Sequence, residues 1–408
     1  SFCSSTALFA SAAHAQVTLD GSVGRAGALP GPNYAISADW GRQVGGNLFH
    51  SFGQFSIHTG ESATFSGPSS VSNIIGRVTG GQMSVIDGAI RSTIPGANLY
   101  LLNPAGVLFG EQATLDVTGS FHVSTADYVR LSDGGRFDAR TPGNSVLTVA
   151  PVAAFGFLGD APGKIELNGS FLRVAEGQTL ALIGGDLNLT NATLYAPAGR
   201  IDLAAVGSAG EVMPTETDLA MQGFGKLGAI AVDRTTAERR KAGEVELGDV
   251  DVSGAGGGAI FIRGGQFVAQ GRSLTQANTT GDQDGRGISI NVDRLTLSGG
   301  SRVESSTSGS GRGGHINVTA REDVTIDGAY FDAGAERLRP SGLIADALSD
   351  SSDAGNITLS TTRLTLTRGG AITSVGFNNS RSGDLNITAT ESVAIDAIHP
   401  DFVGNVDI

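Results

Sequence analysis

The sequence predicts an all-β protein: a right-handed parallel β-helix, built as a single-stranded solenoid, with an N-terminal cap and extra-helical hairpins or loops. Three observations lead to this prediction. Glycine supplies 61 of the 408 residues, roughly double ordinary usage, yet there is no collagen-like period. The apolar side chains are mostly Val, Ile, Leu and Ala, with few aromatics. Short runs of alternating apolar and polar residues recur along the second half, with almost no helical periodicity.

Four segments in the second half share one pattern, which sets the expected fold. They begin at Gly287, Gly314, Gly355 and Gly383, so successive starts are 27, 41 and 28 residues apart. Each carries two alternating apolar pairs. The first pairs are Ile290/Val292, Ile316/Val318, Ile357/Leu359 and Leu385/Ile387; the second pairs are Leu295/Leu297, Val324/Ile326, Leu364/Leu366 and Val393/Ile395. Each unit is too small to bury its inward face alone, so the units must stack. A β-sandwich is the alternative; near-constant units with one insert, near residues 328–340, favour the solenoid.

The other elements follow in chain order. Residues 1–15 are typical of the end of a signal peptide, with a small-x-small site at residues 13–15 before a cut at Gln16. Cys3, the only cysteine, lies in this leader. Residues 133–151 are polar and turn-rich and are expected to be a joint. Residues 164–205 have the same alternating apolar pairs as the later repeats and are expected to form coils of the solenoid. The pairs are Ile165/Leu167, Leu180/Leu182, Leu187/Leu189 and Ile201/Leu203. Residues 206–242 are expected to leave the solenoid as a hairpin, or as one short helix at residues 236–241.

The net charge of the chain disfavours some classes of binding partner. The formal net charge is −13, and an acidic surface repels phosphate backbones and anionic lipids, so binding of nucleic acid or membrane surfaces is disfavoured. No run of about 20 apolar residues follows the leader, so no transmembrane helix is expected. The chain starts without Met and stops within a repeat, which indicates a fragment of a longer protein.

Four sequence blocks between residues 47 and 110 carry a family resemblance. They are Asn47-Leu48-Phe49-His50-Ser51-Phe52, Ile75-Gly76-Arg77-Val78-Thr79-Gly80-Gly81, Asp87-Gly88, and Asn103-Pro104-Ala105-Gly106-Val107-Leu108-Phe109-Gly110. In this order they resemble the haemagglutination-activity domain of filamentous haemagglutinin-like exoproteins. This domain is the N-terminal part of the large exoproteins of two-partner secretion in Gram-negative bacteria. The resemblance implies three regions: a signal-peptide remnant at 1–15, a two-partner secretion domain at 16–135, and a β-helix repeat region at 136–408 that continues beyond the fragment.

The resemblance also points to candidate site residues of a secretion motif. Asn103-Pro104-Ala105-Gly106 is chemically a turn, because Pro fixes φ, Asn closes an Asx-type bond and Gly accepts positive φ. The family usually has Asn-Pro-Asn-Gly-Ile, so Ala105 and Val107 depart from it, and the loss of the second Asn puts a side-chain contact in doubt. The motif either shapes the coil or is read directly by the partner. The other candidates are Asn47, Phe49, His50, Phe52, Arg77, Gly80 and Gly81.

Several residues of the resemblance blocks also have a purely structural interpretation. Phe49, Phe52 and Phe55 are expected to fill and cap the first coils, since a solenoid end needs cover for its strand edge. A metal site at His50 and His58 is disfavoured, because no third ligand stands at a recognisable spacing. Arg77 is expected either to meet an acidic groove of the transporter or to be an ordinary surface residue.

Three further patterns are weighed and set aside. Gly309-x-Gly311-x-x-Gly314 matches a dinucleotide fingerprint, but an extended segment follows it where a helix is needed, so a turn is expected. Glu244/Glu246 and Asp249/Asp251 are expected to share an outward, solvated face; the paired acids of a polysaccharide lyase or hydrolase are the alternative. Residues 282–285 begin like a calcium loop but lack its further acids. No cofactor or metal is expected.

The resemblance implies a function without catalysis. The chain is expected to be exported through the periplasm and outer membrane, to be bound by periplasmic domains of a β-barrel transporter, and to seed β-helix folding of an adhesin that is secreted or displayed at the cell surface. Its receptor, on a host cell, a bacterium or a glycan, is not specified. The alternative is a carbohydrate-active enzyme, a polysaccharide lyase or hydrolase on the same fold, which needs a concave cluster of acids with an Arg or Lys across neighbouring coils.

Overall fold

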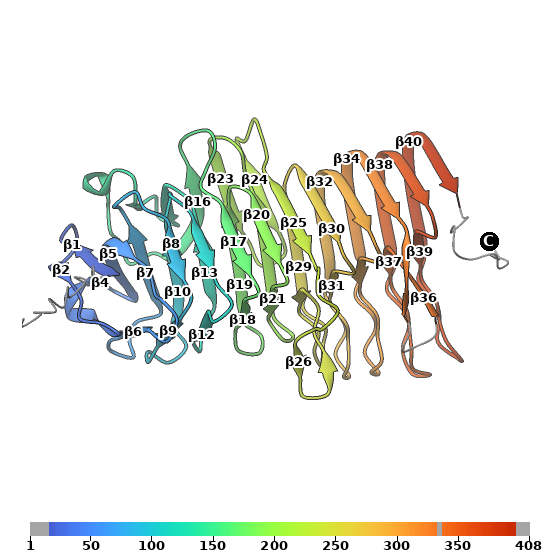
Figure 1. Cartoon of the computed structure of the whole chain (residues 1–408), viewed down its shortest axis with the longest axis horizontal. Helices are drawn as coiled ribbons and strands as arrows, with labels where there is room; N and C mark the ends of the chain where they lie inside the picture. Colours follow the sequence, from blue (N-terminus) through green and yellow to red (C-terminus); the bar gives the residue numbers. More distant parts are fainter. Residues whose placement is uncertain (1–15, 333–336, 397–408) are drawn as a thin grey trace, which may run out of the picture.

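A computed structural model describes residues 16–332 and 337–396. The expected signal-peptide remnant, with Cys3 and the cut site, lies outside these residues. The chain forms an elongated stack of parallel strands that advances steadily from its N-terminal to its C-terminal end (Figure 1). Among the described residues there is no α-helix, only two 3-10 turns, η1 (Ala38–Trp40) and η2 (Pro142–Asn144). The architecture is the expected parallel β-helix.

An antiparallel cap covers the first coil. Its strands are β1 (Val17–Asp20), β2 (Ala26–Ala28) and β4 (Arg42–Val44), and they adjoin β5 (Asn47–Phe55) of the first coil. Both β1 and β4 pair antiparallel with β5, and β1 also pairs with β2. The next strand pairs with β5 in parallel. The cap therefore occupies the edge that the first coil would otherwise leave unpaired, as the sequence predicts.

The main sheet starts as two columns of parallel strands that later merge. The first column follows β5 and consists of β7 (Asn73–Val78), β10 (Asn98–Leu102), β13 (Phe121–Ser124), β19 (Thr179–Gly184), β22 (Arg200–Ala205) and β29 (Ala259–Arg263). The second consists of β8 (Ser84–Ile86), β11 (Val107–Phe109), β17 (Ile165–Asn168), β20 (Leu187–Thr190), β25 (Ala229–Asp233) and β30 (Gln266–Gln270). Both β29 and β30 pair with β32 (Gly287–Ser298), and single long strands follow: β34 (Ile316–Asp327), β38 (Ile357–Thr367) and β40 (Leu385–Asp396).

Two smaller parallel sheets close the coils on another side. One contains β3 (Asn33–Ser37), β6 (Ser62–Ser66), β9 (Ala89–Ser92) and β12 (Thr114–Asp116). The other contains β18 (Phe171–Arg173), β21 (Thr193–Tyr195), β28 (Val250–Asp251), β31 (Leu274–Gln276), β33 (Arg302–Glu304), β37 (Gly342–Ile344) and β39 (Ala371–Thr373).

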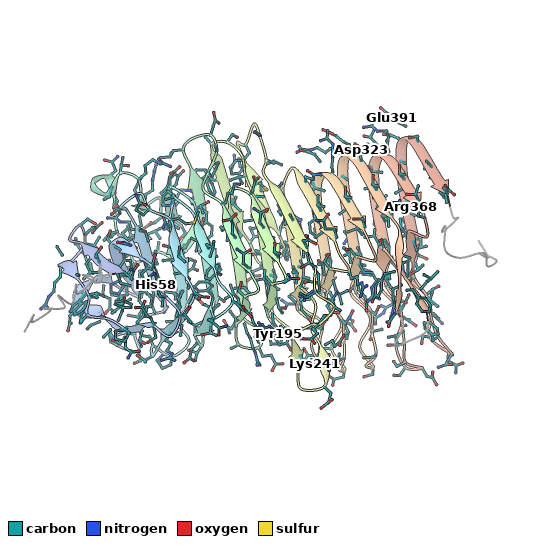
Figure 2. All side chains as sticks on the ribbon, in the orientation of Figure 1. His58, Tyr195, Lys241, Asp323, Arg368 and Glu391 are labelled. Carbon is teal, nitrogen blue, oxygen red and sulfur yellow. The ribbon has the colours of Figure 1, made fainter. Side chains whose placement is uncertain are left out.

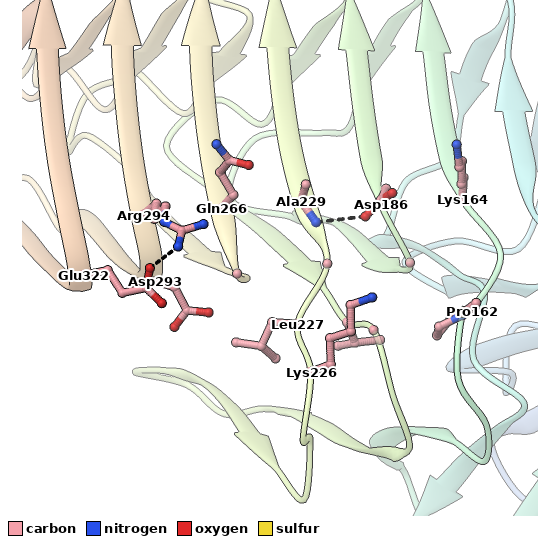
Figure 3. Close-up of a pocket in the computed structure, with 16 residues that line it drawn as sticks. Pro162, Lys164, Asp186, Lys226, Leu227, Ala229, Gln266, Asp293, Arg294 and Glu322 are labelled. Carbon is pink, nitrogen blue, oxygen red and sulfur yellow. Dashed lines mark hydrogen bonds and ion pairs between the residues drawn. The ribbon is translucent and has the colours of Figure 1, made fainter.

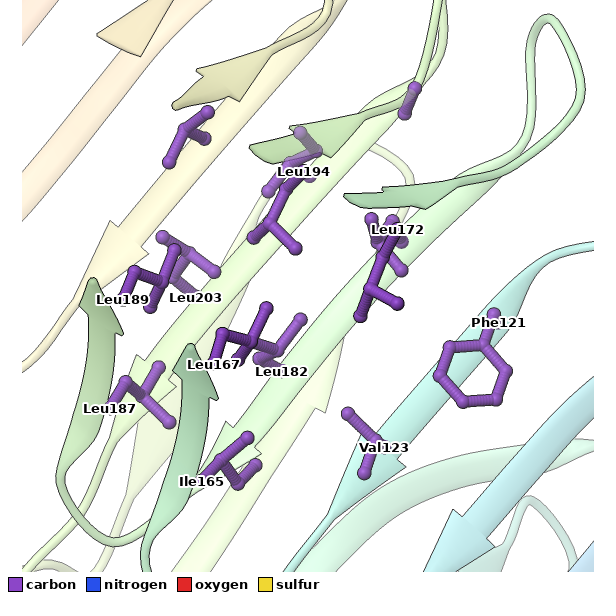
Figure 4. Packing of buried hydrophobic residues seen from close by; sticks show 14 of the residues in the cluster. Phe121, Val123, Ile165, Leu167, Leu172, Leu182, Leu187, Leu189, Leu194 and Leu203 are labelled. Carbon is purple, nitrogen blue, oxygen red and sulfur yellow. The ribbon is translucent and has the colours of Figure 1, made fainter. Parts of the chain in front are cut away.

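The inward side chains of successive coils stack in register and form the main core. In the second column Ile165 lies beside Leu187 and Leu167 beside Leu189. In the first column Leu182 lies beside Leu203. Figure 4 shows these aliphatic side chains meeting between the two columns. Each coil thus buries its apolar face only against its neighbours, which is the expected property of a solenoid.

A second core lies outside the β-helix, beneath an antiparallel extra-helical sheet. This sheet has the order β15-β14-β16-β23-β24, with β14 (Tyr128–Leu131), β15 (Arg136–Asp138), β16 (Val152–Phe157), β23 (Gly210–Pro214) and β24 (Leu219–Gln222). Its apolar side chains, among them Val129, Phe137 and Phe155, pack on outward residues of the main sheet such as Phe49 and Tyr100. Residues 133–151, expected to be a joint, contribute β15 and η2 to this cover.

Three excursions from the solenoid are hairpins. Residues 206–242 were expected to leave the coil as a hairpin or a short helix, and β23–β24 is that hairpin; residues 236–241 are not helical. A second small hairpin follows, β26 (Lys241–Ala242) with β27 (Val245–Glu246). The insert near residues 328–340 forms β35 (Ala329–Asp332) and β36 (Arg337–Pro340). No helix within the described ranges is long and apolar enough to cross a bilayer.

The register confirms all four second pairs of the repeats and corrects one first pair. Leu295/Leu297, Val324/Ile326, Leu364/Leu366 and Val393/Ile395 are aligned across β32, β34, β38 and β40. In the first repeat, however, Ile288 and Ile290, not Ile290 and Val292, align with Ile316 and Val318. Ile288, Ile290 and Val292 are all buried, so alternation alone could not choose between the two alignments.

Ion pairs between successive coils run along the outer corner of the last strands. The Arg363 guanidinium contacts Asp323 of the preceding coil (Nε–Oδ1 2.6 Å) and Glu391 of the following one (Nη1–Oε2 3.0 Å). Arg368 pairs with Asp327. Figure 2 labels Asp323 and Glu391 on β34 and β40, and Arg368 apart from them, just after the end of β38. Because these side chains are substantially exposed, each pair contributes little stability alone and chiefly favours the correct register.

Candidate functional site

The turn after β10 is built around the buried side chain of Asn103. Its Nδ2 donates to the carbonyl oxygen of Gln82 (2.9 Å) and to Ser84 Oγ (3.0 Å), and its Oδ1 accepts from the backbone N–H of Ala105 (3.0 Å). The predicted Asx-type bond is therefore present. Gly106, at φ +116°, donates its N–H to the Asn103 carbonyl (3.0 Å). The departure at Ala105 leaves the turn intact, since only the backbone of that residue takes part.

The Gly80-Gly81 pair is required by space and by backbone conformation. A Cβ on Gly80 would lie 1.9 Å from the Gly53 carbonyl oxygen, so no side chain fits there. Gly81 has φ +73°, the left-handed region that favours glycine. The preceding Thr79 donates its N–H to the Phe52 carbonyl (2.8 Å) and its hydroxyl to Asp20 (2.7 Å). The Thr-Gly-Gly turn thus fastens the second coil to the cap.

Arg77 is fully buried, so the expectation that it is an ordinary surface residue is wrong; a contact with an acidic groove of the transporter stays a prediction. The outer face of β7 is covered by the extra-helical sheet, and the guanidinium lies 4.1 Å from the Phe137 ring centroid. Nε donates to Ser51 Oγ (2.8 Å) and Nη2 to Ser22 Oγ (2.8 Å). Nη1 donates to the carbonyl of Asp138 (2.5 Å) and to Ser145 Oγ (2.6 Å). Burial lowers the pKa of Arg77 to about 10, although nearby Asp20 and Asp138 oppose the shift.

Asn47 begins a ladder of asparagines along the solenoid. Asn73 Nδ2 donates to Asn47 Oδ1 (2.9 Å), and Asn98 Nδ2 donates to Asn73 Oδ1 (3.1 Å). Asn47 in turn donates Nδ2 to the carbonyls of Thr148 (3.0 Å) and Ala150 (2.7 Å). The ladder fixes the register of three coils and holds the segment before β16 against the first coil.

Phe49, His50 and Phe52 follow each other along β5 and belong to different cores. Phe49 lies under the extra-helical sheet, 5.0 Å from Phe137 between ring centroids. Phe52 points into the main core with Phe55, at 4.9 Å. The expected single aromatic cluster is therefore divided between the two faces of the strand. The aromatics still cover the first coil, as expected.

His50 is a buried core histidine. Its ring stacks near Phe52, and neither ring nitrogen has a partner within the described structure. Burial lowers its pKa to about 4, so it is neutral at pH 7. His58 is exposed, and Figure 2 labels it near the N-terminal end. No group of three or more His, Cys, Asp or Glu in the described ranges is placed to hold a metal ion.

The two glycine-rich motifs meet at a small hollow of about 300 Å³. Residues of the Arg77–Gly81 block and of the Asn103 turn form two of its sides, and the segment after β15 forms the third; its lining consists of Val78, Thr79, Gly81, Asn103, Pro104, Ala105, Ala139 and Arg140. Sequence reasoning missed Ala139 and Arg140, because residues some 35 to 60 positions away leave no local signal.

Sequence reasoning also missed Asp20 and Glu211, which join distant parts of this region. Asp20 accepts from the hydroxyls of Ser22, Ser51 and Thr79 (2.7–2.8 Å). Burial raises its pKa, but these hydrogen bonds outweigh burial and the net pKa is lowered. Glu211 of β23 receives three hydrogen bonds from Arg130 of β14 (Nε–Oε1 3.0 Å, Nε–Oε2 3.1 Å, Nη2–Oε2 2.7 Å), and this guanidinium lowers the pKa of Glu211.

The expected outward ladder of acids does not exist. Glu244 and Glu246 are exposed, but Asp249 and Asp251 are buried. Asp249 is held by Arg234 (Nε–Oδ1 2.7 Å) and Arg239 (Nη1–Oδ2 3.0 Å), which fold over it. Asp251 accepts from the backbone N–H groups at positions 248 and 253 and from Gln276, and burial raises its pKa. These acids are structural. The glycine pattern at 309–314 lies, as predicted, in a turn.

A groove of about 460 Å³ brings acids and cations together across neighbouring coils (Figure 3). Its acids are already engaged. Asp186 Oδ1 accepts from the Ala229 N–H (2.9 Å), Asp293 Oδ1 accepts from Arg321 Nε (2.5 Å), and Glu322 pairs with Arg294. Lys164 and Lys226 complete the charged lining. The groove is the kind of cluster that the enzyme alternative requires, although Asp293 and Glu322 each pair with an arginine.

Comparison with known proteins identifies the family. A family model of the TPS secretion domain matches residues 15–262, more than half of the chain. No curated protein sequence matches it. Two solved structures are similar. The HMW1 secretion domain from Haemophilus influenzae has 15% identity and a TM-score of 0.44, covering 92% of this chain and 98% of its own. A filamentous hemagglutinin secretion domain has 13% identity and a TM-score of 0.30, covering 86% and 90%. The chain therefore belongs to the TPS secretion-domain family and is part of a two-partner secretion exoprotein.

Proposed function

We propose that this chain is the secretion and folding module of a surface adhesin, and that its transporter engages it before the first coils close. The family implies a partner transporter and a secreted or cell-surface location. The finer route, through the periplasm to periplasmic domains of an outer-membrane barrel, is part of the proposal.

One observation carries the proposal about timing. The side chains of Asn47, Phe49, Arg77 and Asn103 are all at most 1% exposed in the folded chain. A partner cannot touch them without opening the coils. The hydrogen bonds of Asn47, Arg77 and Asn103 and the packing of Phe49 join the cap, the first coils and the extra-helical sheet, so their role in the folded state is to assemble the first coils. Each later coil then buries its apolar face on a surface that already exists.

We propose that the module is longer than the region of motif resemblance. A boundary between residues 135 and 136 would separate β14 from β15, which are paired antiparallel. The family match reaches residue 262 and includes the whole extra-helical sheet. We therefore place the end of the secretion module near residue 262, with repeat coils after it.

The test is a secretion assay of the chain, with an export signal, in cells with and without the partner barrel. Asn103→Ala removes the side-chain bonds of the turn, and Asn144→Ala, at an exposed asparagine, is the matched control. We expect barrel-dependent appearance in the medium for the native chain and Asn144→Ala, and retention of Asn103→Ala.

Refolding of the purified variants separates the two roles of the motif. Slow refolding of Asn103→Ala together with retention supports a folding seed. Normal refolding with retention would instead mean that the transporter reads Asn103 directly. Secretion of the native chain without any barrel would overturn the proposal as a whole.

The second candidate function is a carbohydrate-active enzyme working in the groove of Figure 3, favoured by its acids and cations on neighbouring coils. We place it second because Asp293 and Glu322 each pair with an arginine instead of standing free as acid and base. Release of reducing ends from polyuronates by the purified protein, abolished in Asp293→Asn, would reverse this order.

A further inference from the structure

Two columns of uncharged polar side chains run along the outer face of the last four long strands. One column aligns Ser289 with Asn317, Thr358 and Asn386; the other aligns Asn291 with Thr319, Ser360 and Thr388. All are exposed except Ser289, which is partly buried. Parallel pairing repeats the set about every 4.8 Å, the distance between neighbouring strands. In Figure 1 these strands, β32, β34, β38 and β40, follow one another without interruption.

The hydrogen-bonding groups of these columns are unused. Ser289 accepts one bond from Arg263 (3.0 Å), and the other seven side chains make no hydrogen bond with any described residue. Asparagines in the first coils behave differently, because Asn47, Asn73 and Asn98 bond to one another along the stack. The outer columns therefore do not serve coil register, and their amides and hydroxyls stay available to a ligand.

A wall rises beside the first part of the columns. The hairpin β23–β24 and the segment after it enclose a hollow of about 470 Å³, whose floor includes Asn291, Asn317 and Thr319. Met221 and Phe224 line the wall and supply apolar surface. A volume of this size, with a few polar groups facing an aromatic ring, is typical of a small-ligand site.

The cations of the hollow are neutralised. Arg263 pairs with Asp218 (2.7 Å) and Arg321 with Asp293 (2.5 Å). The columns carry no charge, and the chain as a whole is at −13. A polyanion therefore finds no net attraction here, whereas a neutral molecule rich in hydroxyl groups finds complementary donors and acceptors.

We propose that this hollow and the columns beyond it bind a neutral oligosaccharide, one end against Phe224 and the rest laid across successive strands. The proposal rests on the proposed adhesin function and names its ligand class. A sugar ring offers an apolar face to the wall and hydroxyls to the floor. A linear glycan meets the same amide and hydroxyl pattern on each further strand.

The test is calorimetric titration of the purified 408-residue chain, which needs no transporter. The probes are four neutral hexasaccharides, made of glucose, mannose, galactose or N-acetylglucosamine, and a heparin hexasaccharide as the anionic comparison. The variant Asn317→Ala with Thr319→Ala removes floor groups, and Thr325→Ala, an outward threonine of the same strand outside the hollow, is the matched control. All are surface changes, and circular dichroism checks the fold.

We expect at least one neutral hexasaccharide to bind, with about tenfold weaker binding by the double variant and unchanged binding by Thr325→Ala. Failure of every neutral probe to bind the native chain overturns the proposal, as does binding that the double variant retains. Binding of heparin alone also overturns it. Any of these failures leaves the secretion assay unaffected, so the two proposals fail separately.

Discussion

Replacing Arg77 by Met tests whether the extra-helical sheet is held to the solenoid by one buried guanidinium. Ser22 and Ser51 keep Asp20 as a partner when the guanidinium is lost. The Asp138 carbonyl and the Ser145 hydroxyl lose their charged donor. A hydrogen bond from a charged group contributes about 1.5–3 kcal/mol, so two of them predict a loss of about 3–6 kcal/mol, similar to the cost of about 3–5 kcal/mol for breaking a buried ion pair.

The assay is urea unfolding followed by hydrogen exchange, because a long solenoid need not unfold in one step. We expect Arg77→Met to unfold at lower urea and to lose exchange protection first in strands β14 to β16. The matched control is Arg91→Met, whose guanidinium is half exposed and lies 3.9 Å from Asp116; its expected cost is below about 1 kcal/mol. Equal unfolding midpoints for the two variants would refute the reasoning.

Three further predictions concern individual residues. Burial lowers the pKa of His50 to about 4 in the folded chain, against 6.5 in the unfolded one. The free energy of unfolding therefore keeps its full value above pH 6.5 and falls by about 1.4 kcal/mol per pH unit between pH 6.5 and 4. Urea midpoints of His50→Leu should depend less on pH than those of the exposed control His58→Leu. Gly80→Ala must displace the carbonyl that its Cβ would meet at 1.9 Å and should cost at least about 2 kcal/mol in urea unfolding, whereas Gly143→Ala, which meets no atom within 4 Å, should cost almost nothing. Phe121→Ala, in the main core, should lower stability by about 3–5 kcal/mol in the same assay, and a loss below 1 kcal/mol would contradict the packing.

The sequence was enough to predict the fold class because inward residues at period two recur in every coil. The pairs Leu295/Leu297 and Val324/Ile326 align as predicted, since each is the only apolar pair in its half of the strand. Residue spacing could not distinguish Ile288 from Val292, where three apolar residues alternate. Likewise β28 has only two residues, too few for alternation to assign a face to Asp249 and Asp251.

The candidate site was predicted less completely, because its geometry depends on long-range cover. The burial of Arg77 could not be predicted, because the outer face of its strand lies under β15, about 60 residues later in the chain. The Asn103 turn was predictable because its bonds are local: Asn103 accepts from the backbone two residues ahead. The two columns of uncharged polar side chains on β32 to β40 could be recognised only from the parallel register that aligns them.

The pairing of β16 with β23 in the extra-helical sheet joins the early part of the chain to a segment that follows it by more than 50 residues. Strands β14 to β16 are complete by residue 157, but β16 keeps an open edge until β23 arrives at residue 210, after two further coils. When Arg130 meets Glu211, 81 residues later, that edge closes. Unfolding of the early coils after this point must break strand pairs and the second core together. Before it, coils can be lost singly. The early coils and the extra-helical sheet, up to residue 222, therefore form one unit that must open together.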